Sequence, residues 1–358
     1  MNWIVASAKW LGGLSMLAIL SIGLKGCLGE HIEVHGAGAS FPAPIYARWR
    51  ALYHREHPDI SIHYRAVGSG RGIKAITAGE VDFGASDALL KKSEERALRQ
   101  PLLSIPTVMG PVVLAYNLPR LEGEVTLSGD LIAGIYLGEI THWNDERIAL
   151  LNPGINLPAL PIRVAHRSDS SGTTHIFTDY LSEVSEEWRN DVGRGKRVFW
   201  PTGNEWAGDG NDGVAHRILL EPGGIGYLEL KYAQNAGLNY AALINRAGKR
   251  VRPTAKAVQE AEQNTPASPE SYLKQSIVNA PGEGSYPISA FTYLLVYRDI
   301  SDMESHRAHA LIDFLKWVLN EGQPEARKLH YVPLPEELRL QVLEDVASIK
   351  LPPLPTVH

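Results

Sequence analysis

The sequence has one cysteine, Cys27, among 358 residues, so the chain cannot form an internal disulfide. It also has no excess of positive charge, because 35 Lys and Arg face 40 Asp and Glu for a formal net charge of -5. That balance creates no basic field and argues against nucleic acid as a partner. Any anion the chain binds must therefore be held by local donors rather than by overall charge.

Signatures of nucleotide and metal enzymes are lacking too. The glycine-rich run 68–72 does not end in Gly-Lys-Ser/Thr and misses the six-residue spacing of dinucleotide folds. Histidine pairs such as His54/His57 and His306/His309 lack the His-Glu-x-x-His pattern, and solvated side chains are the favoured interpretation. We expect no cofactor and no metal.

The N-terminus carries an export signal. Lys9 precedes an apolar run over residues 10–24, which has the length of a signal-peptide core and is short for a membrane span. The sequence Leu24-Lys25-Gly26-Cys27 is similar to the cleavage box of bacterial lipoproteins, although Lys25 replaces the usual small residue. Residues 1–27 are therefore predicted to be a signal peptide of lipoprotein type, with lipidation at Cys27. A conventional signal or an uncleaved anchor is the alternative, and each interpretation places the body in the periplasm or cell envelope.

The chain is organised around residues 167–174, a polar stretch between the apolar run 162–165 and a helical pattern over 175–184. A strand ends and a helix begins there, and the free N–H groups of a helix start attract anions. Ser171 and Thr173 add hydroxyl donors, Gly172 permits close approach, and Arg167 offers a planar fork of donors. The stretch is therefore predicted to form one half of a binding site for an oxyanion. An ordinary N-cap without a ligand is the alternative.

Two more strand-to-helix turns have the same character. The first spans residues 36–42 after a strand at 32–35, and includes Ser40 and Phe41. The second, residues 68–72 with Ser69, follows a strand at 60–64 and precedes a helix at 73–78. A third short strand, 81–85, leads into Asp87. Three such turns together favour a ligand site over isolated helix caps.

Strands alternate with helices along the chain, and this predicts an α/β fold with largely parallel sheets flanked by helices. In such sheets ligands lie at the carboxyl ends of strands, where the three turns belong. The apolar strand 112–116 predicts a first crossing between domains near residue 117, with a return near residue 288. We expect two lobes joined by hinge crossings: residues 28–117 with 288–358, and residues 118–287.

The sequence resembles the periplasmic phosphate-binding proteins of bacterial phosphate ABC importers over roughly residues 32–340. The resemblance rests on several motifs in the same order: residues 36–44 (GAGASFPAP), 81–87 (VDFGASD), 135–138 (IYLG) with Trp143, 151–154 (LNPG), 167–173, 210–213 (GNDG) and 226–227 (GY). It implies a two-lobed, hinged binding-protein fold, no catalysis, and phosphate as the ligand. It also implies a partner importer with two membrane permease subunits and two ATP-binding subunits, and a monomeric protein that meets the membrane only through a lipid anchor.

Carried over residue by residue, the resemblance implies phosphate contacts from two groups of residues. They are Ser40, the Phe41 backbone, Ser69 and Asp87, and Arg167, Ser171, the Gly172 backbone and Thr173. Asp169 matches the carboxylate that orients the arginine.

Departures from the family pattern do not remove a predicted contact. Arg71 replaces a small residue and is expected to point to solvent, while His166 stands where arginine is frequent and Ser170 where glycine is frequent.

An aspartate in an anion site makes sense only when the ligand brings a proton, as phosphate does and sulfate does not. Asp87 would accept that proton, whereas a bare oxyanion would leave two negative groups facing each other. Binding of another oxyanion, such as sulfate or molybdate, is one alternative. Hydrolysis of phosphate esters with Ser171 as nucleophile is another, although the neighbours of Ser171 lack the Gly-x-Ser-x-Gly pattern.

Overall fold

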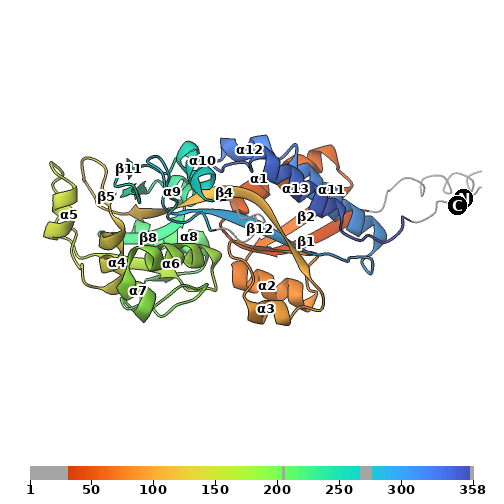
Figure 1. Cartoon of the computed structure of the whole chain (residues 1–358), viewed down its shortest axis with the longest axis horizontal. Helices are drawn as coiled ribbons and strands as arrows, with labels where there is room; N and C mark the ends of the chain where they lie inside the picture. Colours follow the sequence, from red (N-terminus) through yellow and green to blue (C-terminus); the bar gives the residue numbers. More distant parts are fainter. Residues whose placement is uncertain (1–30, 204–205, 267–275, 355–358) are drawn as a thin grey trace, which may run out of the picture. The chain divides into compact units, whose positions relative to one another are not determined.

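The structure, a computed structural model, describes residues 31–203, 206–266 and 276–354 (Figure 1). The expected signal segment 1–27, and Cys27 with it, lie outside the described residues. Across the described ranges, no helix combines the length and the apolar character that crossing a membrane requires.

One set of strands comes from the two ends of the described chain. Strands β1 (Ile32–Gly38), β2 (Ile60–Ala66) and β3 (Phe83–Ser86) pair in parallel in the order β2-β1-β3. Strand β12 (Ser289–Tyr297) continues this first strand set on the far side of β3. Helices α1 (Ala43–Glu56) and α11 (Ser305–Leu319) lie on one side of β1 and β2, and α2 (Ser69–Ala78) lies on the other (Figure 1).

A second strand set follows from the long strand β4 (Leu102–Tyr116). Residues 102–111 of β4 pair with β12, and residues 112–116 pair with β8 (Gly224–Glu229). Beyond β8 come β6 (Arg163–Arg167) and β7 (Ala207–Gly208), both in parallel with their neighbours. Helices α6 (Gly172–Val184) and α8 (Gly210–Leu220) pack against this second strand set. The two sets therefore share β4 as a continuous connection.

The remaining elements complete the layers around these strands. A small sheet contains β5 (Thr126–Leu127), β10 (Ala242–Ile244) and β11 (Arg250–Val251), and β9 (Asn239–Tyr240) pairs with β4. The other helices are α3 (Lys92–Arg96), α4 (Gly129–Leu137), α5 (Glu146–Leu151), α7 (Glu186–Asp191), α9 (Leu230–Asn235), α10 (Ala255–Asn264), α12 (Gln323–Lys328) and α13 (Glu336–Ala347).

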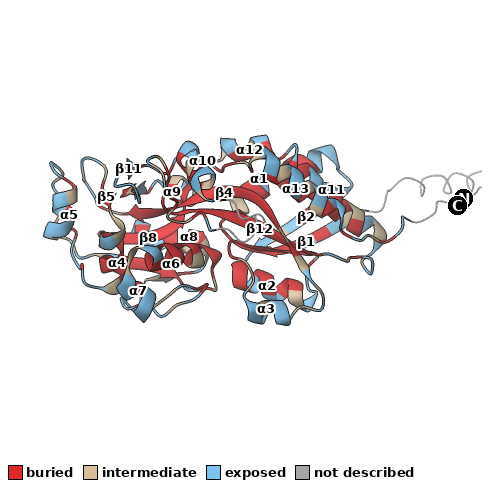
Figure 2. Cartoon of the chain, in the orientation of Figure 1, coloured by how far each residue is buried: buried red, intermediate tan, exposed pale blue. Residues whose placement is uncertain are grey.

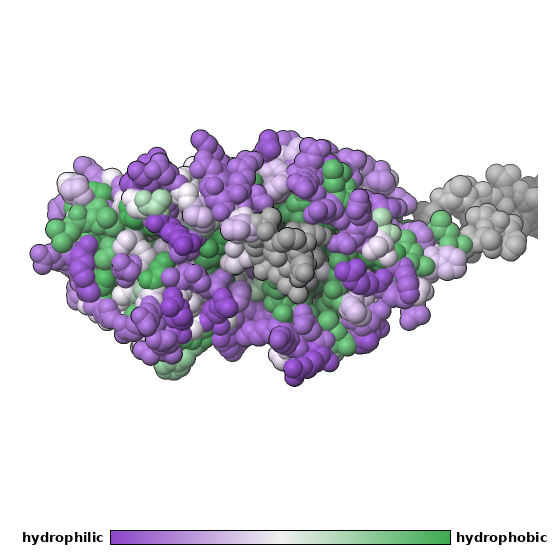
Figure 3. Space-filling model, viewed as in Figure 1, coloured by the Kyte–Doolittle hydropathy of each residue, from purple (hydrophilic) through white to green (hydrophobic). Residues whose placement is uncertain are grey.

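The core lies between the sheet and its helices. Strands β8 and β12 are buried along their whole length, while helices are buried on the side that faces the sheet (Figure 2). Trp49 is fully buried on α1 and donates its indole N–H to the Gly322 carbonyl at 2.7 Å, so its one polar atom is satisfied. The outer face in Figure 3 is largely hydrophilic. Burial on both faces of the strands explains their continuous apolar sequences.

The α/β class is confirmed, but the sheet is mixed rather than largely parallel. Strands β4 and β12 are antiparallel to each other and to β8 and β3 respectively. The strand expected at 112–116 begins ten residues earlier, at Leu102, and runs through Pro106 and Pro111, which cannot donate ladder hydrogen bonds. A register shift between Thr292 and Tyr293 accommodates this part of the pairing. Lobe boundaries near residues 117 and 288 stay a prediction.

Candidate functional site

The stretch 167–174 has the local structure expected of it. Strand β6 ends at Arg167, and α6 begins at Gly172 with Ser171 as its N-cap. Ser171 Oγ accepts the N–H of Thr174 at 3.1 Å. The turn predicted to bind an oxyanion is therefore also the N-cap of α6. Arg167, Ser171 and Thr173 are all buried.

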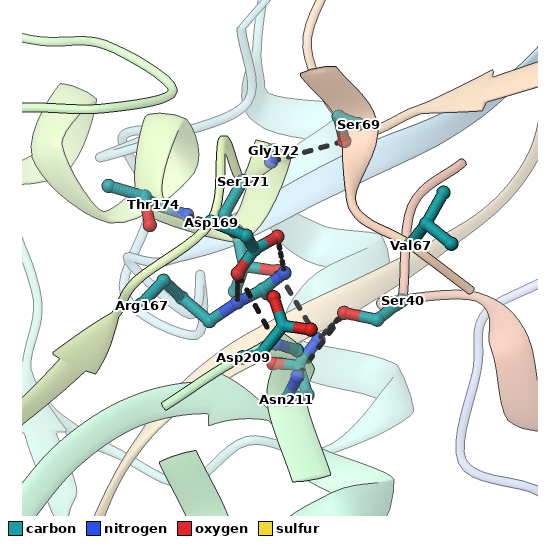
Figure 4. Close-up of polar contacts among 12 residues, drawn as sticks. Ser40, Val67, Ser69, Arg167, Asp169, Ser171, Gly172, Thr174, Asp209 and Asn211 are labelled. Atoms are coloured by element: carbon teal, nitrogen blue, oxygen red, sulfur yellow. Dashed lines mark hydrogen bonds and ion pairs between the residues drawn. The ribbon is translucent and has the colours of Figure 1, made fainter. Parts of the chain in front are cut away.

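Arg167 and Asp169 form a buried, two-pronged ion pair at the centre of the site. Arg167 Nε and Nη2 donate to the two carboxylate oxygens of Asp169 at 2.7 and 2.6 Å, and each side chain is 1% exposed (Figure 4). Burial alone would raise the pKa of Asp169, but the Arg167 hydrogen bonds and charge outweigh it and lower that pKa. The third nitrogen, Nη1, donates to Thr173 Oγ1 at 3.3 Å. The pair therefore fixes the plane of the guanidinium and its remaining donors.

Ser69 brings the second turn against the first. Its Oγ accepts the N–H of Gly172 at 3.1 Å (Figure 4). It also accepts the N–H of Asp87 at 3.2 Å. Nearby, Gly70 N–H donates to the Ser170 carbonyl at 2.8 Å. These hydrogen bonds join the chain before residue 117 to the chain after it.

Glycine at position 172 is required by this close approach. A Cβ atom there would lie 2.4 Å from Ser69 Oγ and 2.7 Å from Asp87 Oδ2, both closer than real contacts allow. Because Gly172 is the first residue of α6, the second of these distances places Asp87 Oδ2 directly beside the start of that helix. Asp87 therefore faces the turn that carries Arg167.

The Asp87 carboxyl is buried, and its pKa lies well above the ordinary value for aspartate. Burial raises its pKa to about 7; the Thr292 and Ser69 hydroxyls and the Arg167 charge pull that pKa down, and Asp169 pushes it up. Thr292 Oγ1 donates to Oδ1 at 2.7 Å, which leaves Oδ2 as the oxygen toward the turn. Near neutral pH this group can both accept and hold a proton.

Ser40 and Phe41 are held by tyrosines from distant elements. Tyr232 donates its hydroxyl to the Ser40 carbonyl at 2.5 Å, and Tyr331 donates to the Phe41 carbonyl at 2.7 Å. Tyr331 is also 3.0 Å from Oε2 of Glu229, whose pKa burial raises to about 8. This network fixes the loop that follows β1.

Hydrogen bonds connect most of the residues that the sequence singled out for the ligand. Ser69 joins Asp87 to Gly172, Arg167 contacts Asp169 and Thr173, and Asn211 lies between Ser40 and Thr173. Phe41 and Ser171 are buried next to Ser40 and Gly172 in the chain, and they are hydrogen-bonded to Tyr331 and Thr174 respectively. The Gly172 amide, expected to face a ligand, donates to Ser69 in this structure.

Several neighbours of the site were not assigned to it from sequence. Asn211 contacts Ser40 and Thr173, and Thr292 contacts Asp87. The motif at residues 210–213 marked Asn211 as a family feature without a role, whereas no sequence signal marked Thr292.

The departures from the family pattern lie at the margin of the site. Arg71 has a 56% exposed side chain and is 3.5 Å from Asp209, which agrees with the expected solvent position. His166 stacks on Trp200 with ring centroids 4.8 Å apart, and its Nε2 is 3.0 Å from the Gly203 carbonyl oxygen. Helix α2 begins at Ser69 rather than near residue 73, so the second turn is itself the first turn of that helix.

Chemically, the site offers many hydrogen-bond donors and few acceptors. Hydroxyls, amide N–H groups and a guanidinium surround one carboxyl with a raised pKa. Such a donor-rich shell suits a small tetrahedral oxyanion, and the carboxyl suits a ligand that carries a proton.

Comparison with known proteins assigns the class. A family model described as the PBP superfamily domain matches residues 28–321, so the chain is a member of that superfamily. A solved periplasmic phosphate-binding protein with bound phosphate has the same fold, with a TM-score of 0.69 at 20% identity over 90% of this chain and 100% of that chain.

Closer relatives define the family. The "Phosphate-binding protein PstS" of Xylella fastidiosa is 42% identical over 314 residues, which cover 87% of this chain and 84% of the relative. The protein of the same name from Pasteurella multocida is 42% identical over 308 residues, covering 85% and 87%. The chain belongs to the PstS family of phosphate-binding proteins.

Proposed function

We propose that this protein binds inorganic phosphate in the cell envelope and delivers it to an ABC import permease. The observation that carries this proposal is the buried Asp87 carboxyl beside the Arg167 turn, with a pKa of about 7 and Oδ2 next to Gly172. One acceptor among many donors matches a tetrahedral anion that has a single hydrogen to share. Family membership supports the same ligand.

The proposed ligand shell combines side chains with backbone N–H groups. Arg167 supplies the positive charge, and Asp169 holds it in place. Phosphate oxygens would be contacted by Ser40, the Phe41 backbone, Ser69, Asp87, Arg167, Ser171, the Gly172 backbone and Thr173. The Gly172 N–H would be shared between the anion and Ser69.

Discrimination against sulfate follows from the same carboxyl. Sulfate has no proton at neutral pH, so Asp87 would either face it as a second negative charge or have to take up a proton first. An unmet buried polar group costs ~1–3 kcal/mol, and more when it is charged. Because the pKa of Asp87 is about 7, taking up this proton costs about a factor of ten at pH 8, so we expect sulfate to bind about tenfold more weakly than phosphate at that pH and the difference to shrink as the pH falls. Molybdate fails for the same reason.

Delivery requires that the site open and close. The ligand residues come from both sides of residue 117, and the hydrogen bonds Gly172–Ser69 and Gly70–Ser170 hold these sides together. We propose that residues 28–117 with 288–358 and residues 118–287 act as lobes that separate about the crossings. The partner would be an importer with two permease and two ATP-binding subunits. It would recognise the closed conformation of a monomeric binding protein.

Location in the periplasm or envelope fits the family and the N-terminal signal. We propose that Cys27 carries a lipid that anchors the protein. Radiolabelled palmitate should be incorporated by cells expressing the full chain and not by cells expressing Cys27→Ala.

A binding role fits Ser171 better than hydrolysis does. Its Oγ accepts the Thr174 N–H as the N-cap of α6, which leaves its O–H to donate to an anion, and among the described residues no histidine is hydrogen-bonded to it as a base. We propose that the protein is not an enzyme. Incubation with a chromogenic phosphate ester should release no product at any protein concentration that binds phosphate.

Calorimetric titration tests the ligand. The purified protein, freed of bound anions by dialysis after mild denaturation and refolding, is titrated with phosphate and, separately, with sulfate at pH 8, where most of the Asp87 carboxyl is ionised. We expect saturable binding of phosphate with one site per chain and much weaker binding of sulfate. Absence of phosphate binding by refolded, native-like protein, or equal affinity for sulfate, would overturn the proposal.

A further inference from the structure

Asn211 is a fully buried amide between two hydroxyls of the candidate site. It lies in the first turn of α8, and its Nδ2 donates to Ser40 Oγ at 2.9 Å and to Thr173 Oγ1 at 3.4 Å (Figure 4 labels Asn211 and Ser40). The two hydroxyls come from opposite sides of residue 117. A single side chain therefore contacts two groups that are expected to bind the ligand.

The orientation of this amide is fixed by a third contact. Asn211 Oδ1 accepts the backbone N–H of Glu229 at 3.1 Å. Because a backbone N–H only donates, the oxygen of the amide must face Glu229 and the NH₂ group must face the hydroxyls. The direction of hydrogen bonding toward Ser40 and Thr173 is thus determined by the fold.

Ser40 Oγ receives two hydrogen bonds from the same residue. The backbone N–H of Asn211 donates to it at 3.2 Å, in addition to the side-chain NH₂ at 2.9 Å. A hydroxyl oxygen has two acceptor positions, so both are filled and only its O–H remains for another partner. Thr173 Oγ1 is filled in the same way by Arg167 Nη1 and Asn211 Nδ2.

We propose that Asn211 is a positioning residue that makes the Ser40 and Thr173 hydroxyls obligatory donors to the bound oxyanion. This inference rests on the proposed function. Without the Asn211 side chain, each hydroxyl would have an acceptor position open and could turn its proton away from the ligand. Asn211 therefore keeps both hydroxyls oriented as donors without being part of the ligand shell itself.

A double-mutant cycle with Ser40→Ala tests this role. Phosphate affinity is measured by calorimetry for the wild type, Asn211→Ala, Ser40→Ala and the double variant. We expect Asn211→Ala to weaken binding about tenfold in the wild type, and only about threefold when Ser40 is already alanine, because the contact to Thr173 then remains alone. A purely structural asparagine would weaken binding by the same factor in both backgrounds.

Asn152 is the matched control. It is also buried, and its side chain makes hydrogen bonds of 2.7–2.9 Å to Thr126 and Ile148 and none to the site residues. Asn152→Ala should leave phosphate affinity unchanged in both backgrounds. If Asn211→Ala does not fold, Asn211→Asp replaces it in the same cycle, since it keeps the oxygen toward Glu229 and reverses the polarity toward Ser40.

The outcomes separate the inference from the proposed function. Wild-type protein that fails to bind phosphate overturns both. Wild-type protein that binds phosphate, together with equal losses in the two Ser40 backgrounds or no loss in Asn211→Ala, overturns the role of Asn211 alone. A loss that shrinks at least threefold in the Ser40→Ala background supports it.

Discussion

Thr292 Oγ1 donates a 2.7 Å hydrogen bond to Asp87 Oδ1, across 205 positions of the sequence. Both groups are buried, and β12 pairs with β3 just before Asp87. The hydroxyl satisfies one carboxyl oxygen and thereby leaves Oδ2 toward Gly172. A residue of another strand thus determines which oxygen of Asp87 faces the start of α6.

Removing that hydroxyl should raise the pKa of Asp87 further. In Thr292→Val the carboxylate loses a donor that favours its charged form, while the desolvation that raises the pKa above its ordinary 3.8 remains. We expect the titration of Asp87, followed by carboxyl-carbon NMR in phosphate-free protein, to move to higher pH. Ser289→Ala is the control, because Ser289 is buried on the same strand and bonds to the Tyr286 carbonyl at 2.8 Å. An unchanged midpoint in Thr292→Val would contradict this account.

Stability of the ligand-free protein should fall as pH rises from 5 to 8. Burial raises the pKa of Asp87 from 3.8 to about 7 and that of Glu229 from 4.5 to about 8. In this range the folded protein holds protons that the unfolded chain has released, so deprotonation favours unfolding. The loss is on the order of 1 kcal/mol per pH unit for each carboxyl until its folded pKa is passed.

Urea unfolding at pH 5, 6, 7 and 8 measures this slope. Glu229→Gln should flatten it, because the neutral amide has no proton to lose. Glu33→Gln, at a side chain that is 53% exposed, should leave it as in the wild type. Stability that rises with pH over this range would show that the two carboxyls are ionised in the folded protein.

The part of the site that could be predicted from the sequence is the part formed by residues that are contiguous in the chain. Residues 167–173 form a strand end, a turn and a helix start, so their role can be inferred from one continuous stretch. The contacts of Asn211 with Ser40 and of Tyr331 with Phe41 span 171 and 290 positions, and no local pattern specifies them. Residues 102–111 were missed as a strand for a related reason: a partner strand and a register shift accommodate Pro106, and neither is visible in the local sequence.

Arg167→Ala should weaken phosphate binding severely, by about a hundredfold or more, because it removes the positive charge and the fork of donors. It would also leave Asp169 as an unpaired buried charge, which costs about 3–5 kcal/mol of stability. The double variant Arg167→Ala/Asp169→Ala separates the two effects. Urea unfolding should show recovered stability relative to Arg167→Ala, while calorimetry should show that phosphate binding stays weak. Affinity near that of the wild type in either variant would remove Arg167 from the ligand shell.

Asp87→Asn should relax the rejection of sulfate. The amide keeps the size of the carboxyl, removes its negative charge and can present an N–H to a bare oxyanion. Phosphate should bind more weakly, since its proton loses the acceptor at Oδ2, and sulfate should bind more tightly, so that the affinity ratio falls at least about tenfold. Calorimetric titrations with both anions at pH 8, above the Asp87 pKa of about 7, measure the ratio. Asp212→Asn is the control: burial also raises the pKa of Asp212, yet no residue of the proposed ligand shell is hydrogen-bonded to its carboxylate, so it should preserve the wild-type ratio. An unchanged ratio in Asp87→Asn would mean that selectivity arises elsewhere in the shell.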